Sequence, residues 1–399
     1  MKVFNSILLL SIGLLLTNCD KEDQPKKIIP VGGLYSLTGN WSSLGKASQS
    51  AINLALVDVN KYLEERGSAY QFSTVISDTR LDTTSAKESI QNAVERNSIR
   101  IFIGPQSSAE LKAIKNYADE NELLVISQGS TANTLAIAGD GIFRFCPGDG
   151  PEALAMSRVM YAAGKRVIIS LARNDAGNIG LQNSVGTSFS ALGGTVDAIT
   201  PYATNLTNFS SLLAELKSKI QTYSTSQGAD KVGIYIASFD ECKDLFSQAS
   251  TDPVFSSVKW YGGDGVVGSS ELISNVAARN FAITTGFIAP NFGLPADPHP
   301  DLETIAAAIK SGSGEEPDAY ALSVYDAMWV IGLTFANYPG VLNDYAKLKS
   351  AFAAQAEQYY GITGPTILND NGDRAISSFE YWAIVNEAGQ YKWKVVGAD

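Results

Sequence analysis

Two pairs of hydroxyl side chains stand where short apolar runs end, and they are the first candidates for ligand chemistry. Ser107 and Ser108 directly precede a segment with helical periodicity, and Ser130 and Thr131 follow the next apolar run. The first backbone N–H groups of a helix have no partner inside it, so hydroxyls beside such groups can bind an anion such as a carboxylate. The alternative is that Ser107 or Ser108 only caps the helix, because serine is a preferred N-cap.

Two further sites could bind the remainder of a small ligand. Asp264 lies between Gly263 and Gly265, and its carboxylate could accept charge-assisted hydrogen bonds from an ammonium group. The alternative for Asp264 is an ordinary turn aspartate. Trp41 and Leu44 lie in a loop before a helix, where a tryptophan could anchor an apolar group or cover the edge of a domain.

The elements that must position these residues alternate between strand and helix. Apolar runs without polar alternation indicate parallel strands buried on both faces, and ligands of such sheets bind beyond the carboxyl ends of the strands. The alternation restarts after Pro147-Gly148, which predicts an α/β fold of two doubly wound parallel-sheet lobes. Crossings near 147, 290 and 361–365 predict a three-crossing hinge. A strand over 281–289 and a buried helix over 319–336 are also expected.

Composition and missing motifs exclude several function classes. The chain has 399 residues and a formal net charge of −11, which argues against nucleic-acid binding. Its single histidine, His299, lies between two prolines, so a histidine-based triad or a multi-histidine metal site is excluded. No phosphate loop or dinucleotide fingerprint occurs. We therefore expect no cofactor, no metal and no enzymatic activity. Cys146 and Cys242 are expected to be free, buried thiols.

The amino terminus has the form of a processing signal. Lys2 precedes an apolar stretch over 7–16, which is too short for a typical membrane span. The sequence Leu16-Thr17-Asn18-Cys19 resembles a bacterial lipobox, which predicts a signal peptide over 1–18, a lipid on Cys19 and a polar tether over 19–27. The alternative is an ordinary signal peptide. The polar residues after Cys19 also resemble a surface-export signal. The anchored protein could therefore face the periplasm or the outer surface of a Gram-negative cell.

Short motifs spread along the mature chain carry a family resemblance. They are Leu37-Thr38-Gly39, Ile103-Gly104-Pro105 with Ser107-Ser108, Ser127 with Ser130-Thr131, Thr207-Asn208-Phe209-Ser210, Gly263-Asp264-Gly265, Tyr325-Asp326-Ala327, Thr363-Gly364-Pro365 and Asn371-Gly372-Asp373-Arg374. In this order and spacing they resemble the type I periplasmic binding proteins of the leucine/isoleucine/valine-binding group, which serve ABC importers. The resemblance implies one lobe of 28–146 plus 288–362 and a second of 147–287 plus 363–399.

The resemblance also implies roles for the candidate residues. Ser108, or Ser107 if the loop is one residue shorter, would hold the α-carboxylate of an amino acid. Ser130 and Thr131 would contribute a backbone carbonyl and a hydroxyl, and Asp264 on the other lobe would hold the α-amino group. Such a zwitterion would bridge both lobes and favour their closure.

Three positions depart from the family pattern. Leu44 and Gly177 stand where the family often has aromatic residues, and Phe239 replaces an aromatic that carries a hydroxyl. Trp41 could compensate for Leu44. Because these changes reshape the pocket, a branched-chain specificity cannot be carried over, and a larger or more apolar amino acid or a small peptide-like amine is equally compatible.

The expected protein is a lipid-anchored, monomeric solute-binding protein that captures an amino acid or related zwitterion for an ABC permease. A second interpretation is a ligand-sensing receptor on the same fold that signals to a partner protein, since fold alone does not separate these two functions.

Overall fold

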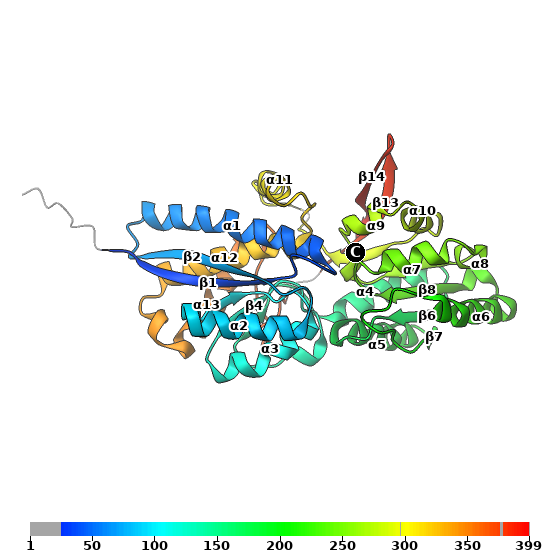
Figure 1. Ribbon diagram of the computed structural model, residues 1–399, viewed down its shortest axis with the longest axis horizontal. Helices are drawn as coiled ribbons and strands as arrows, with labels where there is room; N and C mark the ends of the chain where they lie inside the picture. Colours follow the sequence, from blue (N-terminus) through cyan, green and yellow to red (C-terminus); the bar gives the residue numbers. More distant parts are fainter. Residues whose placement is uncertain (1–24, 296, 376–377, 399) are drawn as a thin grey trace, which may run out of the picture.

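The computed structural model describes residues 25–295, 297–375 and 378–398. Two lobes lie side by side along the long axis of the molecule (Figure 1). Each lobe contains a parallel sheet with helices on its faces, so the predicted α/β class is confirmed. The predicted signal peptide and Cys19 lie outside the described residues.

The first lobe is built on a five-stranded parallel sheet with strand order β2-β1-β3-β4-β5. Its strands are β1 (Lys27–Tyr35), β2 (Tyr70–Asp78), β3 (Ile101–Ile103), β4 (Leu124–Ser127) and β5 (Ile142–Arg144). Its helices are α1 (Ser42–Glu65), α2 (Thr83–Asn97), α3 (Ser108–Glu120), α11 (Leu302–Ser313), α12 (Ala319–Asn337) and α13 (Tyr345–Gln358). The carboxyl ends of β3 and β4 point toward the second lobe and place the two hydroxyl loops at the interface.

The second lobe is built on a four-stranded parallel sheet with strand order β7-β6-β8-β9. Its strands are β6 (Val167–Ala172), β7 (Thr195–Ala198), β8 (Val232–Ala237) and β9 (Lys259–Gly262). Its helices are α4 (Asp149–Ala162), α5 (Ala176–Ala191), α6 (Ser210–Gln227), α7 (Cys242–Ala249), α8 (Pro253–Ser256), α9 (Ser270–Ser274) and α10 (Val276–Thr284). Strands β6 and β8 are buried along their whole length, as expected for central parallel strands.

The carboxyl-terminal part of the chain returns to the second lobe. Strands β10 (Ala289–Phe292), β13 (Phe379–Glu387) and β14 (Gln390–Ala398) form an antiparallel sheet in the order β10-β13-β14, and β11 (Tyr360–Gly361) pairs with β12 (Gly364–Pro365). The hairpin β13–β14 projects from one side of the molecule (Figure 1). Its base is held because Trp393 packs in the core of the second lobe and donates from Nε1 to the carbonyl of Ser269 at 3.2 Å.

The first and third crossings between the lobes lie against each other. Arg144 and Asp373 form a parallel bridge, with backbone bonds from Arg144 N–H to the Gly372 carbonyl and from Arg374 N–H to the Arg144 carbonyl, both at 2.9 Å. The Arg144 guanidinium also pairs with both Asp373 oxygens, at 2.5 Å from Nε and 2.6 Å from Nη2. The hinge is therefore tied by backbone and side-chain bonds together.

The apolar pattern predicted one element correctly, the buried helix over 319–336, and one incorrectly, the strand over 281–289. Helix α12 is confirmed as a core helix: it is apolar and long enough to span a membrane, but it lies mostly buried inside the protein. The strand predicted over 281–289 is wrong, because the segment begins with the last turn of α10, which ends at Thr284, and only its last residue belongs to β10. The side chain of Asn275 accepts from the N–H of Ala278 and starts α10, so local capping overrides the apolar run.

Candidate functional site

Ser107 and Ser108 have different tasks, although they are neighbours. Ser107 is the N-cap of α3: its hydroxyl donates to Glu110 Oε2 at 2.5 Å and accepts from the Glu110 N–H at 3.3 Å. The Glu110 carboxylate also accepts from the Ser107 N–H, which completes a capping box. The hydroxyl of Ser107 is thus occupied by the helix, and the capping alternative applies to this residue.

Ser108 is the serine that faces the second lobe. Its Oγ accepts a hydrogen bond from the Ala132 N–H at 3.2 Å and lies 3.0 Å from the Ser130 hydroxyl. Each hydroxyl has one proton to donate, so the Ser108–Ser130 pair uses one proton internally and offers the other to an acceptor in the cleft. Across the interface, a Cβ added to Gly177 would lie 3.3 Å from this Oγ.

The second hydroxyl loop is fixed through its backbone. The Ser130 carbonyl accepts from Arg144 Nη1 at 3.0 Å, and the Thr131 carbonyl accepts from the Asp149 N–H at 2.8 Å. Both residues are buried. The Ser130 carbonyl is thus bonded to the hinge and the Thr131 carbonyl to the start of α4. The hydroxyls of this loop are therefore the better candidates for hydrogen bonds to a ligand.

Aromatic side chains join the two lobes at the cleft. Trp41 of the first lobe stacks on Phe239 of the second, with ring centroids 4.4 Å apart and planes at 25°. A Cβ on Gly129 would meet the Trp41 ring at 3.3 Å and Leu44 at 3.6 Å, so these residues form one apolar wall. Beside them Asn40 Nδ2 donates to Glu241 Oε2 at 2.7 Å. The two lobes are in direct contact in this structure.

Asp264 lies at the same interface. It opens a short 3-10 turn after β9, and its Oδ2 accepts from the hydroxyl of Tyr320, at the start of α12 in the first lobe, at 2.6 Å. Its backbone N–H donates to Glu152 Oε1 at 3.1 Å. Burial of the carboxyl raises the pKa of Asp264 above its usual range. The bond to Tyr320 shows that this side chain lies where the two lobes meet.

Sequence reasoning missed three other polar side chains around Asp264. Asp149 and Glu152 lie one helical turn apart on α4, and Tyr235 reaches them from β8. Burial raises the pKa of Asp149 to about 7, although Thr131 and Asn133 partly offset it. Burial and the nearby carboxyl of Asp264 also raise the pKa of Glu152. The available signal was an acid pair spaced by three residues directly after the first hinge.

A cavity of about 270 Å³ opens onto the cleft. The starts of α2 and α3 line it on the first lobe, and the loops after β6 and β8 line it on the second. Ser107 and Phe239 both contribute to its wall. Arg173 also lines it, but its guanidinium is engaged by Asp175 at 2.9 Å and by the Thr204 carbonyl at 2.9 Å. The cavity is therefore an outer vestibule of the cleft.

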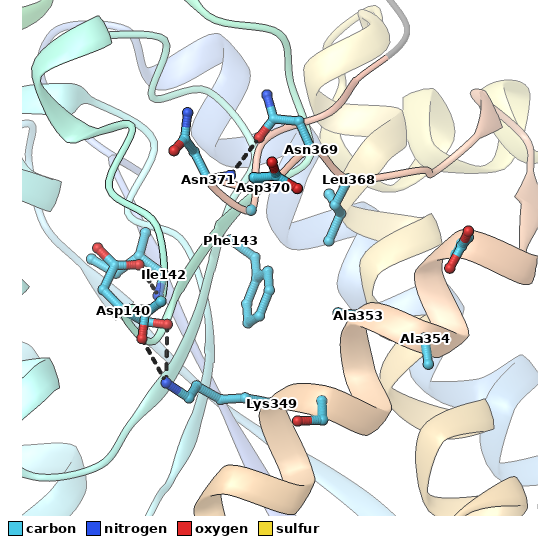
Figure 2. A pocket seen from close by; sticks show the side chains of 14 residues that line it. Asp140, Ile142, Phe143, Lys349, Ala353, Ala354, Leu368, Asn369, Asp370 and Asn371 are labelled. Carbon is cyan, nitrogen blue, oxygen red and sulfur yellow. Dashed lines mark hydrogen bonds between the residues drawn. The ribbon is translucent and has the colours of Figure 1, made fainter.

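A larger cavity of about 480 Å³ lies elsewhere (Figure 2). It is lined by the β5 region, by α13 and by the turn 368–372, and none of the predicted site residues reaches it. Lys349, its cationic group, is engaged by the backbone carbonyls of Gly139 and Asp140 at 2.9 and 3.3 Å. Because it lies away from the cleft and from every predicted site residue, we do not assign the ligand to it.

The remaining sequence expectations concern thiols and metals. Cys146 and Cys242 are free and buried, as expected, and burial raises the pKa of each thiol. Within residues 25–295, 297–375 and 378–398, no group of three or more histidine, cysteine, aspartate or glutamate side chains has the arrangement of a metal site.

The chain is similar to known proteins in both sequence and fold. Residues 47–387 match the family described as "Receptor family ligand binding region". The uncharacterized protein MJ1266 of Methanocaldococcus jannaschii is 28% identical over 96% of this chain and 92% of its own length. The chemotactic signal transduction substrate-binding protein BasB of Halobacterium salinarum is 29% identical over 37% of this chain and 38% of its own.

One solved structure shows the same arrangement of lobes. The branched-chain amino acid transporter substrate-binding protein LivJ of Streptococcus pneumoniae, in complex with isoleucine, superposes with a TM-score of 0.72 at 18% identity, over 93% of this chain and 99% of that one. The family match covers most of the chain and the two lobes share this architecture. The chain therefore belongs to the receptor ligand-binding family and has the fold of the type I periplasmic binding proteins.

Proposed function

We propose that the protein is an extracytoplasmic, lipid-anchored solute-binding protein that captures an amino acid or related zwitterion between its lobes and delivers it to an ABC importer. The observation that carries this proposal is the placement of two complementary groups on opposite lobes. The Ser108 hydroxyl of the first lobe faces the second, and the Asp264 carboxylate of the second bonds to Tyr320 of the first.

The geometry suggests how binding would favour closure. A ligand whose carboxylate bonds to Ser108 and whose ammonium bonds to Asp264 touches both lobes only when they are closed. Its binding energy is then larger for the closed form, and this difference shifts the population toward closure. The same groups include no nucleophile with an adjacent base, so we expect binding without turnover. The domain boundaries predicted above, 28–146 plus 288–362 and 147–287 plus 363–399, are part of this proposal.

A thermal-shift screen followed by calorimetry tests the proposal. The panel holds amino acids, amides, short peptides, polyamines and sugars, and a rise in melting temperature with amino-acid-like ligands is the expected result. Asp264→Ala should weaken the affinity by about 2–5 kcal/mol through loss of a buried charge pair. Its effect on the unliganded melting temperature should be much smaller. Unchanged affinity in this variant would refute the ammonium role.

The anchoring part of the proposal has its own test. Cys19→Ser should abolish membrane attachment of the full chain in its host. Labelling with a radioactive fatty acid that persists in this variant would contradict lipidation at that position.

A second candidate function is ligand sensing. The similarity to the chemotactic protein BasB favours it, because that relative carries the name of a signalling component. Genomic neighbours discriminate the two functions: permease and ATPase genes beside this gene favour uptake, and a signalling gene favours sensing.

A further inference from the structure

A buried group of carboxylates, rather than one carboxylate, faces the interface between the lobes. Residues three apart on a helix lie on one face, so α4 presents Asp149 and Glu152 together. The 3-10 turn after β9 adds Asp264, whose N–H bonds to Glu152 Oε1 at 3.1 Å. All three side chains are buried. We call these three residues the acid cluster.

Unpartnered polar atoms point into the acid cluster. Within the described chain, Glu152 Oε2 and the Tyr235 hydroxyl have no hydrogen-bond partner, and the Asp149 oxygens have only the poorly oriented contacts with Thr131 and Asn133. The Tyr235 side chain is fully buried. A Cβ on Gly263 would lie 3.1 Å from this hydroxyl and 3.7 Å from Glu152 Oε1, so tyrosine and glutamate converge on the same spot. Buried polar atoms without partners cost free energy, which indicates that a ligand supplies the missing donors.

Two glycines of α5 pack closely against polar groups that face the cleft. A Cβ on Gly180 would lie 2.8 Å from Asp149 Oδ2, and one on Gly177 would lie close to Ser108. Both glycines are on the first turns of α5, three residues apart. Side chains at these positions would press on the polar groups that face the cleft.

The acid cluster has little counter-charge among the described residues. Arg144 lies close enough to lower the pKa of Asp149, but its guanidinium is bonded to both oxygens of Asp373 and to the carbonyls of Ser130 and Ala132. In the described residues, no lysine or arginine forms an ion pair with any member of the cluster. A fourth acid, the partly exposed Asp318 that caps the start of α12, lies close enough to Asp264 for their charges to interact. Each carboxyl of the cluster that ionises would therefore lack a paired cation of the protein, and a cationic ligand would be favoured there.

We propose that the ligand is a small organic cation with two ammonium groups, such as a diamino acid or a diamine, rather than a neutral zwitterion. This inference rests on the proposed function and specifies its ligand class. A neutral amino acid would bring one positive charge to three buried carboxylates and would add a carboxylate of its own. A second ammonium group offers three more N–H donors, which match the unpartnered oxygens of Asp149 and Glu152. The absence of a metal-site arrangement in the described residues favours an ammonium over a divalent metal ion.

Lysine and norleucine form a matched pair for the test, because they differ by the side-chain ammonium group. Isothermal titration at pH 7.5 should give at least tenfold tighter binding of lysine than of norleucine, with 1,5-diaminopentane also binding. Glu152→Gln keeps the shape of the side chain and removes one charge, so the lysine preference should fall to less than threefold. Asp140→Asn, which neutralises a carboxylate paired with Lys115 outside the cleft, should leave the preference unchanged.

The outcomes separate this inference from the proposed function. If norleucine binds as tightly as lysine or more tightly, the dication inference is wrong, but the proposed function as an amino-acid-binding protein stands. If no amino acid or amine in the panel binds, both this inference and the proposed function are overturned. The wild-type ratio decides the question even if Glu152→Gln fails to fold, and a preference that persists in a folded Glu152→Gln protein contradicts the role of the acid cluster.

Discussion

Replacing Asp373 by asparagine should destabilise the protein strongly, because it breaks the ion pair at the hinge. Arg144 and Asp373 are 1% and 4% exposed, and two bonds of 2.5 and 2.6 Å join them in parallel. Removing one partner of a buried pair leaves the other charge uncompensated and typically costs about 3–5 kcal/mol. Asparagine keeps the volume but replaces one acceptor with a donor that faces the guanidinium. The expected loss is a large share of the about 5–15 kcal/mol by which domains are stable.

Equilibrium unfolding in urea, followed by circular dichroism, measures this loss as a change in the free energy of unfolding. The matched control is Asp252→Asn, which neutralises one partner of a half-exposed pair with Lys217 at 2.6 Å and keeps an acceptor for the N-cap bond from the Val254 N–H. Exposed pairs contribute little, so the control should leave the transition midpoint unchanged within error. A loss below about 1 kcal/mol for Asp373→Asn would show that the hinge pair adds no more than a surface pair does.

Three further predictions concern single side chains. Ser107→Ala should lower the free energy of unfolding by about 1 kcal/mol, as for other lost N-caps, whereas Ser108→Ala should mainly weaken ligand affinity; titration and urea unfolding of both variants check this. The carboxyl of Asp149 has a pKa raised to about 7, so folding favours its protonated form and stability falls as pH rises from about 4 through 7; a melting temperature that rises over this range contradicts it. Cys146 and Cys242 should react with a thiol reagent only after unfolding; rapid labelling of native protein opposes this.

Much of the fold could be predicted because its signals are local. Helix α1, over Ser42–Glu65, is an example, since its small and apolar residues recur at helical spacing. The apolar runs of β3 and β4 were equally direct. The segment 281–289 failed because a short apolar run fits a buried strand and a buried helix alike. There the capping side chain of Asn275 was the better signal.

The candidate site was less predictable because it depends on contacts between distant residues. Two adjacent serines cannot be told apart by type, and only the capping box with Glu110 assigns Ser107 to the helix. The stacking of Trp41 on Phe239 joins residues of two lobes, which no local pattern encodes. The acid cluster was hidden for a similar reason, since Asp149 and Glu152 resemble ordinary helix-start acids until Asp264 is placed beside them.

The bonded first and third crossings limit how the lobes can move. Two backbone hydrogen bonds and two side-chain hydrogen bonds join Arg144 to the segment 372–374. Sliding one crossing past the other would break all four bonds at once, whereas bending both together as one ribbon keeps them. The bonds therefore favour a hinge motion in which both crossings bend together. Such a motion would change the angle between the cleft walls more than their register, so Ser108 and Asp264 would meet again when the lobes close.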